Sequence, residues 1–116
     1  MNDKILPILL ITALAPLGAS AGEISRDEVA GLYAECDRQR QEKLAPLKAQ
    51  EIEDCVEAGR GDRAYCERYN SDFGERIALA GGGSRPGLFY DLPVCEKAYD
   101  AERYFNINPS ADTYSP

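Results

Sequence analysis

Apolar residues recur with helical spacing in the segment that follows residue 25. They stand at positions i, i+3, i+4 and i+7 and are Val29, Leu32, Tyr33 and Cys36. This spacing places them on one face of an α-helix. Ser25 precedes the segment and Glu28 stands three residues later, which is the pattern of an N-terminal capping box. The pattern therefore predicts a helix that starts just after Ser25.

Pro46 allows two interpretations of the next segment. Apolar positions resume after it, at Leu47, Ile52, Cys55 and Val56. Pro46 either occupies the first turn of a second helix or kinks one long helix that runs to about Ala58. The surrounding letters, LAPL, contain no Gly, Asn or Asp that would form a turn, which favours the kink.

The stretch CVEAGRGDRAYC, residues 55–66, contains the Arg-Gly-Asp tripeptide that cell-adhesion ligands display on tethered loops. Here, Gly59 stands where a helix C-terminal glycine belongs, and Asp62 stands where the next helix needs an N-cap. Gly61 lets the chain reverse between them. Adhesive display requires a longer projecting loop, so we predict a turn between two helices.

The helix after this turn is predicted to stop at Gly74. Its apolar face would comprise Tyr65, Cys66, Tyr69 and Phe73. Residues 74–92 then form a long linker that contains Gly and Pro, with residues 81–83 (Gly-Gly-Gly) as a flexible joint.

A last helix is predicted with Asp91 as its cap and Pro93 in its first turn. Its apolar stripe would comprise Val94, Ala98, Ala101 and Phe105. Residues 106–116 are polar and contain proline, which predicts a loose C-terminal tail. The predicted fold class is therefore all-α: a small, disulfide-stapled helical hairpin or bundle of three or four helices.

Residues 1–21, MNDKILPILLITALAPLGASA, have the features of a secretory signal peptide. Lys4 supplies positive charge, residues 5–17 are mostly apolar, and Ala19-Ser20-Ala21 is a small-x-small cleavage site. We predict cleavage before Gly22, no membrane anchor after cleavage, and a periplasmic or secreted protein. The mature part would be one four-cysteine domain, residues 22–105, followed by the tail.

Four cysteines in an exported chain predict two disulfides. A zinc site is disfavoured because the chain has no histidine and no C-x-x-C pair, so no metal is predicted.

Two pairings of the cysteines remain open. If the first helix continues through Pro46, Cys36 and Cys55 are about 28 Å apart and cannot bond. Cys55 would then pair with Cys66, and Cys36 with Cys95. If Pro46 starts an antiparallel helix, Cys36–Cys55 and Cys66–Cys95 become feasible. We favour the first, nested pairing because the turn at Gly59 and Gly61 has the clearer signal.

The net charge of −7 opposes binding to nucleic acid or to an anionic membrane, and it is compatible with a basic partner. The absence of histidine excludes Ser-His-Asp and Cys-His catalytic arrangements. No phosphate-binding or calcium-binding loop motif is present, so no cofactor is predicted. A carboxylate cluster is interpreted as a solvated helix face; it comprises Glu51, Glu53, Asp54 and Glu57.

Two resemblances concern export and the cysteines. The run from YCERYNSDFG to RPGLFYDLPVCEKA resembles small four-cysteine exported bacterial proteins, and it identifies no site. The nested pairing is similar to the twin-cysteine helical hairpins of mitochondrial import proteins. Those have regularly spaced cysteine pairs, whereas the spacings here are unequal, so no function is carried over.

The candidate contact site is the stretch RPGLFYDLP, residues 85–93. Leu88, Phe89 and Tyr90 are adjacent large side chains that cannot all enter a core built from helical stripes. With Arg85 at the rim, they would suit a contact with another protein of the same compartment. The alternative is that two of them pack back over the hairpin, with the Tyr90 hydroxyl in water.

These observations favour an exported protein that acts by binding rather than by catalysis, such as an inhibitor, an accessory subunit or an envelope-stress factor. A small hydrolase that uses carboxylates is one alternative. A structural envelope protein without a specific ligand is another.

Overall fold

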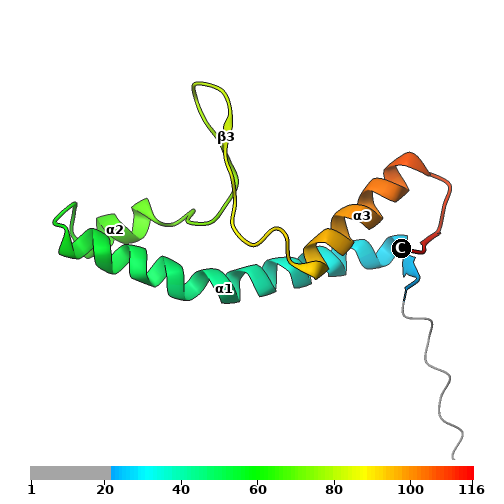
Figure 1. Cartoon of the computed structure of the whole chain (residues 1–116), viewed down its shortest axis with the longest axis horizontal. Helices are drawn as coiled ribbons and strands as arrows, with labels where there is room; N and C mark the ends of the chain where they lie inside the picture. Colours follow the sequence, from blue (N-terminus) through cyan, green and yellow to red (C-terminus); the bar gives the residue numbers. More distant parts are fainter. Residues whose placement is uncertain (1–21) are drawn as a thin grey trace, which may run out of the picture.

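One helix of 29 residues, α1 (Val29–Glu57), runs along most of the length of the described part of the protein (Figure 1). The computed structural model describes residues 22–116, and the predicted signal peptide lies outside them. α1 continues through Pro46, so the interpretation as a single long helix is confirmed. Pro46 is exposed, and water can therefore reach the backbone where the proline removes a helical hydrogen bond.

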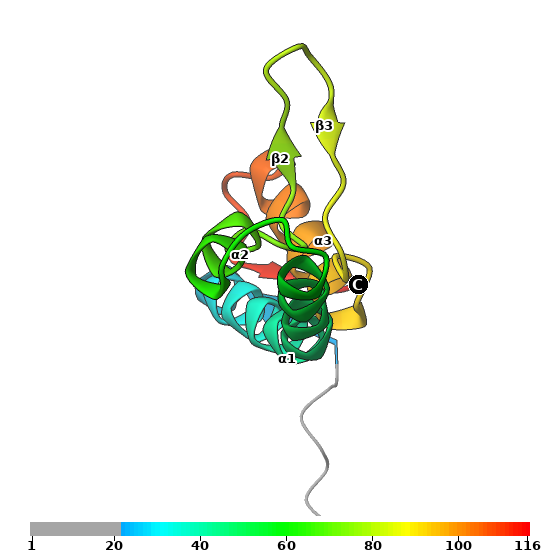
Figure 2. The same cartoon turned by 90° about the vertical axis from the view of Figure 1, so that its left-hand side faces the viewer.

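Two shorter helices lie on the same side of α1 (Figures 1 and 2). α2 (Arg63–Tyr69) lies beside the C-terminal end of α1, and α3 (Pro93–Ile107) crosses its N-terminal half. The structure contains two disulfides: Cys55–Cys66 joins α1 to α2, and Cys36–Cys95 joins α1 to α3. This is the nested pairing, which a continuous α1 requires because it keeps Cys36 and Cys55 far apart.

The protein is mostly helical, but it is not purely all-α, because it also contains two short antiparallel strand pairs. β2 (Ile77–Ala78) pairs with β3 (Ser84–Arg85), with Ile77 opposite Arg85. The predicted linker of residues 74–92 is therefore a hairpin over part of its length. It projects from the helices like a finger (Figure 2).

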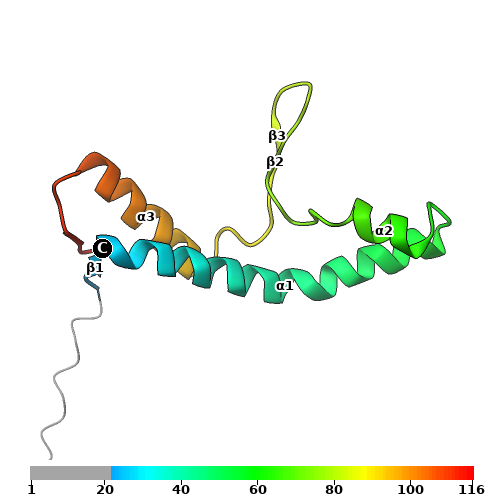
Figure 3. The ribbon, with the colours of Figure 1, turned by 180° about the vertical axis from the view of Figure 1, so that it is seen from behind.

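The second strand pair corrects the prediction of a loose tail at residues 106–116. β1 (Ile24–Ser25) pairs with β4 (Thr113–Tyr114), which brings the C-terminus beside β1 (Figure 3). The Arg26 side chain also donates hydrogen bonds to three backbone carbonyls of the same segment, those of Asn108, Pro109 and Ala111. Residues 106 and 107 belong to α3.

The hydrophobic core is small and lies where these strands meet α1 and α3. Its buried members are Ile24, Ala101 and Phe105, and the half-buried side chains around them are Val29, Leu32, Tyr104, Ala111 and Tyr114. The predicted stripe of α3 is buried at Ala98, Ala101 and Phe105. In contrast, the only buried residue of α2 is Cys66, so the disulfide is the main attachment of α2 to α1. No helix of residues 22–116 is long and apolar enough to cross a membrane.

The helix starts follow the sequence signals in part. The Glu28 carboxylate accepts a hydrogen bond of 2.6 Å from the Ser25 backbone N–H, and a single 3-10 turn (Arg26–Glu28) then leads into α1. Asp91 is not the cap of α3, because Leu92 occupies the N-cap position and Pro93 follows it. A residue before proline is restricted to the extended conformation, which is also the conformation of an N-cap, so Pro93 places the cap at Leu92.

The Arg-Gly-Asp segment is the predicted turn. Gly59 has a φ of 67°, which glycine adopts readily, and the Asp62 carboxylate accepts a 2.8 Å hydrogen bond from the Tyr65 backbone N–H. Gly61 was expected to let the chain reverse, but the structure gives a different reason for a glycine at this position, which is the space that the Tyr65 ring occupies. A Cβ atom there would lie 2.2 Å from Cδ1 of the Tyr65 ring. The ring therefore packs directly on the glycine backbone.

Replacing Asp62 by alanine should lower the free energy of unfolding by about 1 kcal/mol, because the Tyr65 amide loses its acceptor. Asp62→Asn and Asp62→Ser keep an acceptor and should be nearly neutral. Urea denaturation of the three variants measures this order. If Asp62→Asn abolished integrin-type cell attachment at unchanged stability, the interpretation as a cap would give way to an adhesion motif.

Candidate functional site

The base of the hairpin is clamped to the middle of α1 by Arg40. The Leu88 backbone N–H donates to the Gly74 carbonyl at 2.9 Å, which closes the segment between them into a loop. Arg40 donates from Nε to the Leu88 carbonyl at 3.1 Å and from Nη2 to the Gly74 carbonyl at 3.0 Å. Only 3% of Arg40 is exposed. A buried guanidinium with these bonds holds both ends of the loop in place.

Tyr90 is part of this clamp. The guanidinium carbons of Arg40 and Arg76 lie 3.7 and 4.8 Å from the centroid of its ring, which is the geometry of cation–π contacts. The Tyr90 hydroxyl donates a 3.0 Å hydrogen bond to the Glu75 carboxylate. The hydroxyl is therefore bound to protein and not left in water, and the ring holds the loop against α1.

Phe89 has an unusual backbone conformation. Its φ of 62° lies in the left-handed region, where a bulky residue is rare and costs about 1 to 3 kcal/mol. Its half-buried ring lies 5.7 Å from the Lys43 ammonium. The bonds on either side of it, at Leu88 and Tyr90, hold the backbone in this conformation. With Phe89 and Tyr90 packed back, Leu88 stays 40% exposed.

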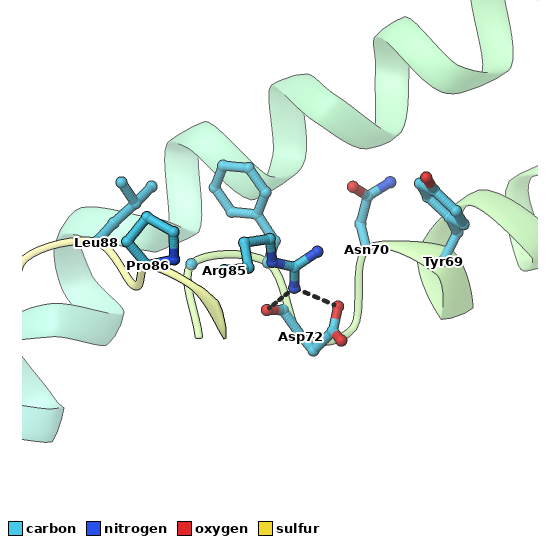
Figure 4. Close-up of a pocket in the computed structure, with 8 residues that line it drawn as sticks. Tyr69, Asn70, Asp72, Arg85, Pro86 and Leu88 are labelled. Carbon is cyan, nitrogen blue, oxygen red and sulfur yellow. Dashed lines mark hydrogen bonds and ion pairs between the residues drawn. The ribbon is translucent and has the colours of Figure 1, made fainter. Parts of the chain in front are cut away.

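Leu88 lines a groove between the end of α2 and the exit of the hairpin (Figure 4). The groove has a volume of about 420 Å³ and is lined by Tyr69, Asn70, Asp72, Phe73, Gly74, Arg85, Pro86 and Leu88. Arg85 reaches across it, with Nη2 at 3.4 Å from the Asp72 carboxylate and 3.4 Å from the Asp72 carbonyl. Of the four candidate contact residues, the structure thus places Arg85 and Leu88 in the groove. Phe89 and Tyr90 are not among its lining residues.

Two tyrosines of the predicted apolar face of α2 are exposed. Tyr65 and Tyr69 stack on each other with ring centroids 6.0 Å apart, and 66% of Tyr69 is exposed. α2 has seven residues and packs mainly against α1, and Cys66 is the buried residue of its apolar face. The helix was predicted to stop at Gly74, but α2 ends at Tyr69, so Phe73 lies outside the helix and the apolar face is shorter than predicted.

Sequence reasoning also missed Arg40 and Asn70, the two polar residues that are buried in the described chain. Arg40 lies four residues after Cys36 and four before Leu44, so it continues the buried face of α1. A charged residue at a core position of this kind is a signal for a buried polar contact.

The acidic cluster on α1 lies on the exposed surface and includes an ion pair. Glu53 contacts Arg63 of α2 at 2.7 Å, and the Arg63 guanidinium lowers the pKa of the Glu53 carboxyl. Similarly, the hydrogen bond from Arg38 and, to a smaller extent, the one from Gln39 lower the pKa of the Glu35 carboxyl to about 2. The groove itself contains one carboxylate, Asp72, so it lacks the facing pair that a two-carboxylate hydrolase needs.

Within residues 22–116, no group of three or more His, Cys, Asp or Glu side chains is placed to hold a metal ion. Comparisons with family models, with curated proteins and with solved structures found no match to this chain. The groove between α2 and the hairpin is therefore the candidate functional site.

Proposed function

We propose that this chain is an exported, non-catalytic protein-binding module, an inhibitor or accessory subunit, that contacts its partner through the groove between α2 and the hairpin. The single observation that carries the proposal is the exposure of Leu88. A strained Phe89 backbone and the buried Arg40 clamp keep Leu88 in the groove wall. Strain of this kind persists only where the surrounding structure enforces it, and it concentrates at functional positions.

The two disulfides support an oxidising compartment, and the proposed location is the periplasm or the outside of the cell. The proposal needs no cofactor. The competing hydrolase is less favoured because the groove has one carboxylate. A structural envelope protein without a specific ligand makes the opposite prediction for the variants that follow.

Replacing Leu88 by aspartate should abolish capture of the partner from the native compartment while the melting temperature changes little. Loss of one anchor side chain typically costs 2 kcal/mol or more of binding free energy, and a charge in its place costs more. The matched control is Leu79→Asp, at an exposed leucine of the hairpin outside the groove lining, which should capture normally. Affinity capture with mass spectrometry, together with thermal melts, measures both effects. Equal capture by wild type and Leu88→Asp would contradict the proposal.

A further inference from the structure

The groove contains a hydrogen-bond acceptor that the protein does not use. Asn70 is 7% exposed, and its Nδ2 donates to the Cys66 carbonyl at 2.9 Å. Because a carbonyl accepts only from the amide nitrogen, this bond fixes the orientation of the Asn70 amide. Its Oδ1 has no hydrogen-bond partner among the described residues, and it is turned toward the side of the groove where Arg85 and Asp72 lie (Figure 4).

No fully enclosed side-chain nitrogen or oxygen in residues 22–116 lacks a partner, so the Asn70 oxygen keeps some accessible surface, and Asn70 is one of the residues that line the groove. Asp72 supplies a second acceptor. Its half-exposed carboxylate is 3.4 Å from Arg85, longer than the 2.7–2.9 Å of a well-formed charge-assisted bond. A carboxylate offers about four lone-pair positions, so Asp72 can accept from an additional donor. Both acceptors call for a ligand with several N–H groups.

Beside these two acceptors, the groove is lined by an aromatic side chain, Tyr69. Tyr69 is 66% exposed and stacks on Tyr65, which gives a flat surface that attracts a cation through the ring quadrupole. The segment that supplies the α2 side of the groove has the complementary charge: residues 51–75 contain eight acidic and three basic residues, a net charge of −5 out of −7 for the whole chain. The basic side chains beside this part of the groove are engaged within the protein, Lys48 with the Ser71 carbonyl and Arg40 with the Gly74 carbonyl. A cationic ligand is favoured on both counts.

We propose that the groove binds an arginine side chain presented by an apolar segment of a partner protein. This inference rests on the proposed function and names the partner's chemistry. The guanidinium stacks on Tyr69 and donates to Asn70 Oδ1 and the Asp72 carboxylate. The apolar neighbours in the partner segment contact Phe73, Pro86 and Leu88. Arginine is favoured over lysine because its planar fork can stack and donate to two acceptors together.

Arg85 of the chain itself already approaches Asp72, which shows that a guanidinium fits at this position. It would therefore compete with the partner's arginine for the same carboxylate. Removing Arg85 should tighten binding, whereas an acidic ligand would instead depend on Arg85.

The test uses a fluorescein-labelled peptide with one central arginine between leucines, measured by fluorescence anisotropy with the full mature chain. The matched peptides carry citrulline, a neutral isostere, or glutamate in place of the arginine. We expect the citrulline peptide to bind at least tenfold more weakly and the glutamate peptide more weakly still. Binding of the arginine peptide should weaken as the salt concentration is raised. The charges on the peptide and in the groove are partly exposed, so dissolved ions screen their attraction.

Variants of the protein localise the effect. Tyr69→Ala and Asp72→Asn should each weaken binding of the arginine peptide about tenfold, whereas Tyr69→Phe keeps the ring and should bind normally. Arg85→Ala should bind two- to tenfold more tightly. These three side chains are each at least half exposed, so the variants should keep the fold, which circular dichroism checks.

Three results would overturn the inference. The first is equal affinity for the arginine and citrulline peptides, with binding of both peptides lost in Leu88→Asp. This result would rule out recognition of arginine, and the proposed function would still hold. Binding that is unchanged in Tyr69→Ala and Asp72→Asn would show general attraction to the acidic surface. Absence of binding at millimolar peptide, while Leu88→Asp still loses the captured partner, would show that the groove takes a different chemistry.

Discussion

Removing the Cys36–Cys95 disulfide, with alanine at both positions, should lower the free energy of unfolding by about 4 kcal/mol at 25 °C in the chain-entropy model. The bond closes a loop between residues 59 positions apart and joins α1 to α3. Small domains are stable by only about 5 to 15 kcal/mol, so this loss is a large part of the total. Chemical denaturation of the double variant measures it.

The matched comparison is the double alanine variant of Cys55 and Cys66. Its loop is shorter, at a separation of 11, and the expected loss is about 3 kcal/mol. The consequence should be local, however, because α2 buries nothing but Cys66. Hydrogen exchange should show α2 unprotected while α1 and α3 keep their protection. Free thiols in the denatured, unreduced wild type would contradict both disulfides.

Replacing Arg40 by methionine should lower the free energy of unfolding by about 3 to 5 kcal/mol, although no apolar volume is lost, because two hydrogen bonds from a charged donor are removed and each contributes about 1.5 to 3 kcal/mol. The Leu88 and Gly74 carbonyls would each lose a charge-assisted donor in a partly buried place, and Tyr90 would lose the guanidinium 3.7 Å from its ring. Denaturant melts measure the stability. Hydrogen exchange at the Leu88 amide, which closes the loop, reports on the clamp directly.

The control is Arg38→Met, two residues away on the exposed side of α1. Arg38 forms ion pairs with Glu35 and Glu42 at 2.6 Å, but the three side chains are between 41% and 65% exposed. Exposed pairs contribute about 0 to 1 kcal/mol, so this variant should stay close to wild type. Equal stability of the Arg40 and Arg38 variants would show that the loop is held by something other than Arg40.

The sequence alone was sufficient where structure follows from local chemistry. The turn at Gly59–Asp62 follows because a left-handed glycine and an N-cap carboxylate act on neighbouring backbone groups. The Glu28 capping contact and the apolar stripe of α3 were predicted on the same basis. The need for two disulfides followed from the cysteine count and the predicted export.

Tertiary structure decided the features that join distant segments. β1 and β4 are separated by almost the whole folded chain, and no periodicity in two residues could reveal their pairing. The hairpin of residues 77–85 was hidden for the same reason, since strands of two residues are shorter than any alternating pattern.

The candidate groove shows the same division. The sequence singled out residues 85–90 because three large side chains could not share one core face. Which of them stays exposed depends on Arg40, which lies 48 residues before Leu88 and binds its carbonyl. Sequence patterns determine which backbone and side-chain groups need partners nearby. Only the folded chain brings the distant partners into contact, because their pairing depends on the path of α1 through Pro46 and on the two disulfides.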